Sequence, residues 1–148
     1  MAEIVALSKI LNVREQEKHD AQKKYHRSIE YFEGVATQLY TLLKKKEDAE
    51  GAREEYIQHT IPIDKIREQL AYIEMLNKQI LQLQQEVKVA RSEMEEKQVI
   101  LTDAHVEVKK FEKIITYRRK EQEEIIQKNE KIFMDEISVQ QYLNQKNR

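Results

Sequence analysis

Apolar residues recur every seven positions between Ile66 and Ile115, and polar residues fill most of the positions between them. The first apolar line consists of Ile66, Ile73, Ile80, Val87, Met94, Leu101, Val108 and Ile115. A second line follows most of these by three residues and consists of Leu76, Leu83, Ala90, Ala104 and Phe111. A seven-residue period predicts a helix under-wound to about 3.5 residues per turn that supercoils around a partner helix of similar length.

The N-terminal part of the chain carries a rougher stripe of the same kind. Alternating steps of three and four residues from Ile4 to Tyr56 meet mostly apolar side chains. The stripe lapses at Arg14 and Lys18, and again from Lys46 onwards. This pattern predicts a second long amphipathic helix.

A break separates the two stripes at Pro62. Proline disrupts a helix interior but fits the first helical position, and the Asp64 carboxylate then lies near the positive end of the helix dipole. We expect one helix to end near His59 and the next to begin at about Pro62. Because the two stripes have similar lengths, the chain is predicted to fold back as an antiparallel hairpin roughly 80 Å long.

The residues beyond the second stripe have no counterpart in the first helix. The seven-residue line meets Gln122 and stops, and an apolar stripe then resumes at Ile125, Ile126, Ile132, Phe133, Ile137 and Val139. We expect an overhang that is helical through about Asn129 and less ordered afterwards, with Asp135 or Ser138 capping a separate short final helix. The uncovered stripe predicts contact with a second protein.

The fold class is therefore all-α, a long two-stranded antiparallel coiled-coil hairpin with a C-terminal helical overhang. The predicted segments are a first coiled-coil helix at 1–59, a turn at 60–64, a second coiled-coil helix at 65–117 and an unpartnered extension and tail at 118–148.

Composition agrees with long helices that each bury one stripe. The 148 residues are 40% hydrophobic and 36% charged, with two Gly, one Pro and no Trp. The net charge of −1 lacks the basic footprint of a nucleic-acid-binding protein, and the absence of Cys excludes disulfides and thiolate metal sites. The start has no signal-peptide pattern, and no stretch approaches roughly 18 apolar residues, so we expect a soluble cytosolic protein.

The sequence offers no set of catalytic or metal-binding residues. A two-stranded rod has no concave pocket, and the chain has no Gly-rich phosphate loop and no His-Glu-x-x-His motif. His19 and His26 lie two helical turns apart, which is too far to share a metal ion. His59 falls at the turn and His105 beside the seam. We predict a protein that is not an enzyme and that uses no cofactor and no metal.

Four motifs, in order along the chain, resemble the FliJ family of flagellar type III export components. The resemblance spans the whole chain. The motifs are Leu7-x-x-Ile10-Leu11-x-x-Arg14-Glu15-x-Glu17, Tyr72-Ile73-x-x-Leu76-x-Lys78-x-Ile80, Val106-Glu107-Val108-Lys109-Lys110-Phe111-Glu112-Lys113 and Met134-Asp135-Glu136-Ile137.

The resemblance implies a cytoplasmic rod similar to the central stalk of rotary ATP synthases. Such a rod would sit in the pore of the hexameric flagellar export ATPase, touch the cytoplasmic domain of the export gate and cycle export chaperones. It would reach the inner face of the cell membrane only through these partners. Candidate contacts with the ATPase ring are Leu7, Leu11, Arg14, Ile125, Ile126, Ile132 and Phe133. Candidate contacts with the gate are Tyr72 and Leu76, although Leu76 also belongs to the second seam line.

Three alternatives share the same predicted shape. They are a general coiled-coil scaffold, the equivalent stalk of a virulence injectisome, and a chaperone whose exposed stripe holds unfolded clients. A scaffold would dimerise through Ile125–Val139, whereas a stalk is expected to be largely monomeric alone and to bind one copy per ring.

Overall fold

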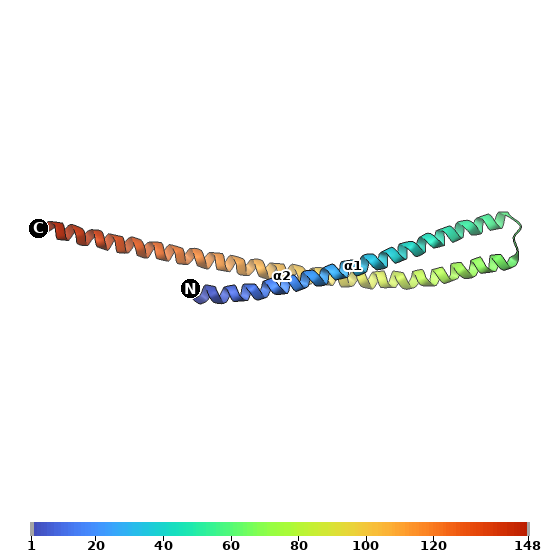
Figure 1. Ribbon diagram of the computed structural model, residues 1–148, viewed down its shortest axis with the longest axis horizontal. Helices are drawn as coiled ribbons and strands as arrows, with labels where there is room; N and C mark the ends of the chain where they lie inside the picture. Colours follow the sequence, from blue (N-terminus) through green and yellow to red (C-terminus); the bar gives the residue numbers. More distant parts are fainter. Residues whose placement is uncertain (1, 148) are drawn as a thin grey trace. The chain divides into compact units, whose positions relative to one another are not determined.

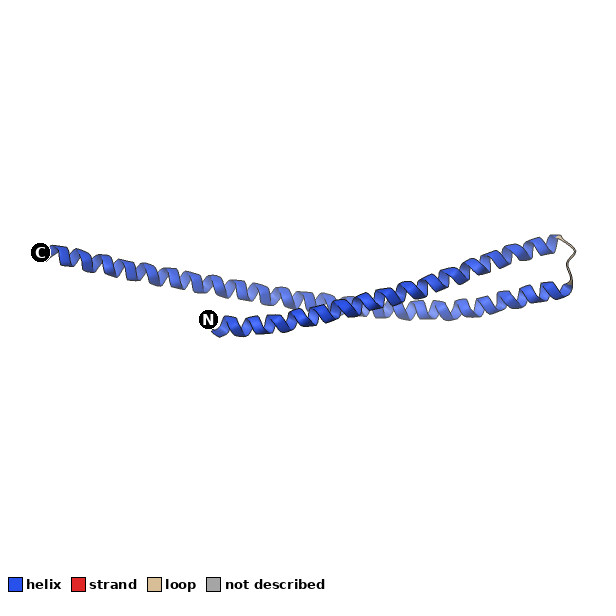
Figure 2. Cartoon of the chain, viewed as in Figure 1, coloured by secondary structure: helices blue, strands red, loops and turns tan. Residues whose placement is uncertain are grey.

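The computed structural model describes residues 2–147, which form two α-helices joined by one short loop (Figures 1 and 2). Helix α1 is Ala2–Gln58 and helix α2 is Ile63–Lys146, and this part of the chain contains no strand. The backbone amides of Lys65 and Ile66 donate to the Pro62 carbonyl at 3.1 and 3.4 Å, which closes the first turn of α2. The single proline therefore lies where the sequence predicts the reversal.

The chain divides into two compact units, and each unit pairs a segment of α1 with a segment of α2. The turn unit is His19–Thr102 and contains the reversal. The terminal unit combines Met1–Lys18 with Asp103–Arg148. Each unit is described separately below.

The turn unit is held together by a narrow apolar seam. Its centre is a cluster of Ala49, Ile73 and Leu76, with Leu42 packed against it. Every position of the two predicted apolar lines in this part of α2 is buried or half-buried. Farther from the turn, the Arg91 guanidinium lies 5.7 Å from the centroid of the Phe32 ring. The later α1 residue Ala49 packs with the early α2 residues Ile73 and Leu76, and the earlier Phe32 contacts the later Arg91, so the pairing is antiparallel.

The terminal unit continues the same pattern with fewer buried residues. Val108 and Ile115 on α2 are buried, and the facing residues Ile4, Leu7 and Leu11 on α1 are half-buried. The predicted all-α, antiparallel coiled-coil hairpin is confirmed, with two long helices that each bury one stripe.

Two predictions for the C-terminal part of α2 are wrong. The helix continues without a break to Lys146, so the expected loss of helix after about Asn129 is wrong. The separate final helix capped by Asp135 or Ser138 is wrong as well, because both residues lie inside α2. Residues 121–147 contain no Gly and no Pro and are rich in Glu, Gln, Lys and other good helix formers. Asp and Ser cost only a few tenths of a kcal/mol within such a helix.

Candidate functional site

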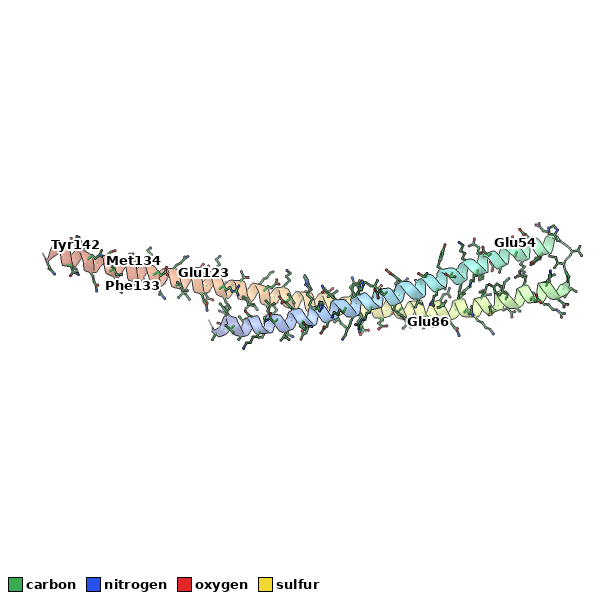
Figure 3. All side chains as sticks on the ribbon, in the orientation of Figure 1. Glu54, Glu86, Glu123, Phe133, Met134 and Tyr142 are labelled. Atoms are coloured by element: carbon green, nitrogen blue, oxygen red, sulfur yellow. The ribbon has the colours of Figure 1, made fainter. Side chains whose placement is uncertain are left out.

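The overhang is the part of α2 at residues 123–147, which extends beyond the first residues of α1. Every side chain in the overhang is exposed except that of Ile137, which is half-buried. Ile125, Ile126, Ile132 and Phe133 expose between 48% and 61% of their surface. Phe133, Met134 and Tyr142 project from a stretch of ribbon with no second helix beside it (Figure 3). A large apolar surface of this kind on a helix is typical of a protein-binding site.

The exposed apolar residues form two ridges along the overhang. At about 100° per residue, the first ridge contains Ile125, Ile132 and Val139, and the second contains Ile126 and Phe133. The strip between the ridges is polar, and its residues are Gln122, Asn129 and Glu136. The first ridge lies on the continuation of the second seam line of α2, in the part of that helix that α1 does not cover. A partner of the overhang must therefore cover both ridges.

The three predicted contacts on α1 occupy the seam of the terminal unit. Leu7 and Leu11 are half-buried against α2. Arg14 has its guanidinium 5.9 Å from the centroid of Phe111 and forms an ion pair with Glu17 at 3.0 Å. The Arg14 Nε is buried and has no hydrogen-bond partner, which carries a desolvation cost. Arg14 thus contacts α2 through Phe111, and 36% of its side chain is exposed.

Sequence reasoning missed an ion pair that joins the two helices at the base of the overhang. The Arg118 Nε lies 3.2 Å from Glu3 Oε1, and its Nη1 lies 3.2 Å from Glu121 Oε2. All three side chains are at least 42% exposed, so the pairs contribute about 0–1 kcal/mol. Arg118 follows Phe111 by seven residues and therefore occupies the next position of the second seam line. This spacing already indicated in the sequence that Arg118 lies close to α1.

The two predicted gate residues lie in different environments of the turn unit. Leu76 is only 1% exposed and is the largest fully buried side chain among the described residues. It packs in the cluster with Ala49 and Ile73. Tyr72, one turn earlier, is 40% exposed. Tyr72 is therefore accessible to a binding protein, whereas Leu76 is not and packs in the seam between the two helices.

Tyr72 also borders an open groove between α1 and α2 that the sequence did not predict. The groove has a volume of about 590 Å³. Its α1 wall is formed by Lys45, Asp48, Ala49 and Tyr56, and its α2 wall by Lys65, Glu68, Gln69 and Tyr72. Both walls belong to the turn unit.

The described residues show no cluster of three or more His, Asp or Glu side chains able to hold a metal ion. His26 pairs with Glu30 on its own helix at 3.2 Å. Within residues 2–147, neither helix contains a segment apolar enough to cross a membrane.

Comparison with known proteins gives a consistent assignment. A family profile described as "Flagellar FliJ protein" matches residues 3–147. The chain is 32% identical over 149 residues to a protein of Bacillus subtilis (strain 168) named "Flagellar FliJ protein", and the match covers 98% of this chain and 99% of the relative. No solved structure matches the chain significantly.

Proposed function

Because the chain belongs to the FliJ family of flagellar proteins, we propose that it is a non-catalytic stalk of the flagellar type III export apparatus. The stalk binds the hexameric export ATPase at one end and the cytoplasmic domain of the export gate elsewhere along its length. It also assists the cycling of export chaperones. Its place is the cytoplasm at the flagellar base, where it reaches the inner face of the membrane through these partners.

The overhang is the observation that carries the proposed ATPase contact. Its apolar ridges lie in the same compact unit as the first turns of α1. We assign the ring contact to Leu7, Leu11, Arg14, Ile125, Ile126, Ile132 and Phe133. The overhang residues bind through their exposed apolar surface, and the α1 residues pack against the part of α2 from which the overhang extends. A single asymmetric stalk contacts six ring subunits unequally, so it biases their states through differential contacts.

The proposed gate contact is centred on Tyr72. Its half-exposed ring offers apolar surface and a hydroxyl, a combination enriched at protein interfaces. Leu76 belongs to the same contact but acts from inside the seam, where it fixes the position of the helix turn that carries Tyr72.

The decisive experiment measures ATP turnover and hexamer formation of the export ATPase with and without this protein. The wild-type chain is expected to raise one or both. An Ile132→Asp/Phe133→Asp double variant is expected to lose the effect, because it places charges on both ridges. A Gln127→Asp variant is the matched control, because residue 127 lies on the opposite face of the same helix.

Two results would contradict the stalk. If the wild-type chain changes neither turnover nor hexamer formation, the proposed ATPase contact is wrong. If the chain instead dimerises stably through Ile125–Val139 and has no effect on the ATPase, a coiled-coil scaffold is the better description.

A further inference from the structure

A second open groove between α1 and α2, also within the turn unit, carries an excess of positive charge. Its volume is about 500 Å³. Lys97, which borders it, follows Tyr72 by 25 residues on α2, roughly 37 Å along the helix, so this groove is separate from the proposed gate contact. The residues that line the groove are Lys24, Arg27, Ser28 and Tyr31 on α1 and Glu93 and Lys97 on α2.

The protein itself does not neutralise the cations of this groove. Three positive side chains and one negative side chain line it. Within residues 2–147, the ion pairs involve other cations, and none of them includes Lys24, Arg27 or Lys97. Glu30, which follows Arg27 by three residues, lies 3.2 Å from His26 instead. The three cations are therefore available to an anionic ligand.

Lys97 occupies a seam position, where an apolar residue would stabilise the hairpin. The second seam line of α2 passes from Ala90 to Ala104, and Lys97 lies midway between them. Its side chain is half-buried, so its aliphatic stem packs along the seam while the ammonium group reaches the groove. Ordering this long side chain and restricting the hydration of its charge lower stability. A residue that lowers stability in this way is typical of a binding site.

The spacing of the cations matches that of carboxylates on a helix. Lys24 and Arg27 are three residues apart, which is about 4.5 Å along α1. A helix with acidic residues three or four positions apart presents carboxylates at a similar spacing on one face. Ser28 is 8% exposed and small, so it leaves room at the base of the groove, and the 55% exposed Tyr31 offers an aromatic ring to the apolar side of such a helix. Cations spread over two helices along an open groove suit a segment of this kind better than a small free anion.

We propose that this groove binds an acidic helical segment of another protein. Lys24 and Arg27 contact the carboxylates of that segment from α1, and Lys97 contacts them from α2. Glu93 disfavours a carboxylate beside it and so helps to fix the orientation of the segment. The inference adds a further binding surface to the stalk and depends on neither the ring contact nor the gate contact.

The experiment is an NMR titration of the isotopically labelled full-length chain with a synthetic helical peptide of Glu and Ala. The matched control peptide carries Gln in place of every Glu. The Glu peptide is expected to shift the amide signals of residues 24–31 and 93–97, and the Gln peptide is expected to leave them unchanged. Because exposed charges are screened by salt, the dissociation constant of the Glu peptide should rise with ionic strength.

Lys97→Met separates a binding role from a structural one. It is expected to raise the melting temperature by at least about 2 °C, because it places an apolar side chain in the seam, and to weaken peptide binding by at least about threefold. The exposed pair Lys24→Gln/Arg27→Gln is expected to weaken binding by at least about fivefold. Lys44→Gln/Lys88→Gln is the matched control, because it also removes two exposed positive charges of the turn unit but neither residue lines the groove. Its affinity is expected to match that of the wild type.

Several results would overturn the inference. Equal shifts with the Glu and Gln peptides, or none with either, would show that the groove does not select carboxylates. Shifts of the same signals by inorganic phosphate but not by the Glu peptide would identify a site for small anions instead. Equal weakening by the control variant would reduce the effect to general charge attraction. If Lys97→Met fails to fold, the affinity of Lys24→Gln/Arg27→Gln relative to the control variant decides, and wild-type affinity in that variant excludes the groove.

Discussion

Replacing Leu76 with Ala removes the most buried large side chain of the described residues and tests where the stability of the hairpin resides. Leu76 is 1% exposed and packs in the cluster with Ala49 and Ile73. Leu→Ala substitutions in protein cores cost about 2–5 kcal/mol. A two-helix seam is one layer deep and can partly close or admit water, so we expect a value near the lower limit, about 2–3 kcal/mol.

The measurement is a thermal melt followed by circular dichroism, supported by urea unfolding. For a chain of this size, about 2–3 kcal/mol corresponds to a fall in melting temperature of roughly 5–10 °C. Leu81→Ala is the matched control, because Leu81 lies on the same helix and is 67% exposed. It is expected to change the stability by less than about 0.5 kcal/mol. Equal melting temperatures for the two variants would refute the assignment of Leu76 to the stabilising seam.

Three further predictions follow from the same contacts. Tyr72→Ala should weaken gate binding while changing stability by less than about 0.5 kcal/mol, because the side chain is 40% exposed; an unchanged affinity would remove Tyr72 from the gate contact. Arg14→Leu should raise the melting temperature, because an apolar side chain against Phe111 replaces a buried Nε that lacks a hydrogen-bond partner. A large fall in the melting temperature would show instead that the guanidinium contact stabilises the seam. Glu3→Gln should cost less than about 1 kcal/mol, and the difference from the wild type should shrink at high salt, because its pair with Arg118 is exposed; a salt-independent loss would contradict this ion-pair assignment.

The helices and their reversal could be predicted from the sequence because the signals are local. The seven-residue period from Ile66 to Ile115 identifies the buried stripe of α2, and every residue on that line is buried or half-buried. Pro62 disrupts a helix wherever it occurs in the interior, so the turn is also a local property. The C-terminal part of α2 was underestimated because Asp135 and Ser138 were interpreted as caps, although residues 121–147 contain nothing that stops a helix.

The roles of residues with similar sequence patterns were decided only by the tertiary structure. Tyr72 and Leu76 form one motif in the sequence, but their exposed fractions are 40% and 1% because only Leu76 faces Ala49 across the seam. Arg53 occupies a position of the predicted α1 stripe and is nevertheless exposed, whereas the adjacent Ala52 is half-buried.

The sequence by itself therefore determined the helices, the stripe on each and the position of the reversal, since these depend on spacing along one chain. The tertiary structure decided which stripe residues pack, which are displaced and which remain available to a partner. The physical reason is that these outcomes depend on the residue that faces each position from the other helix, and that pairing is set only when the two helices come together in one register.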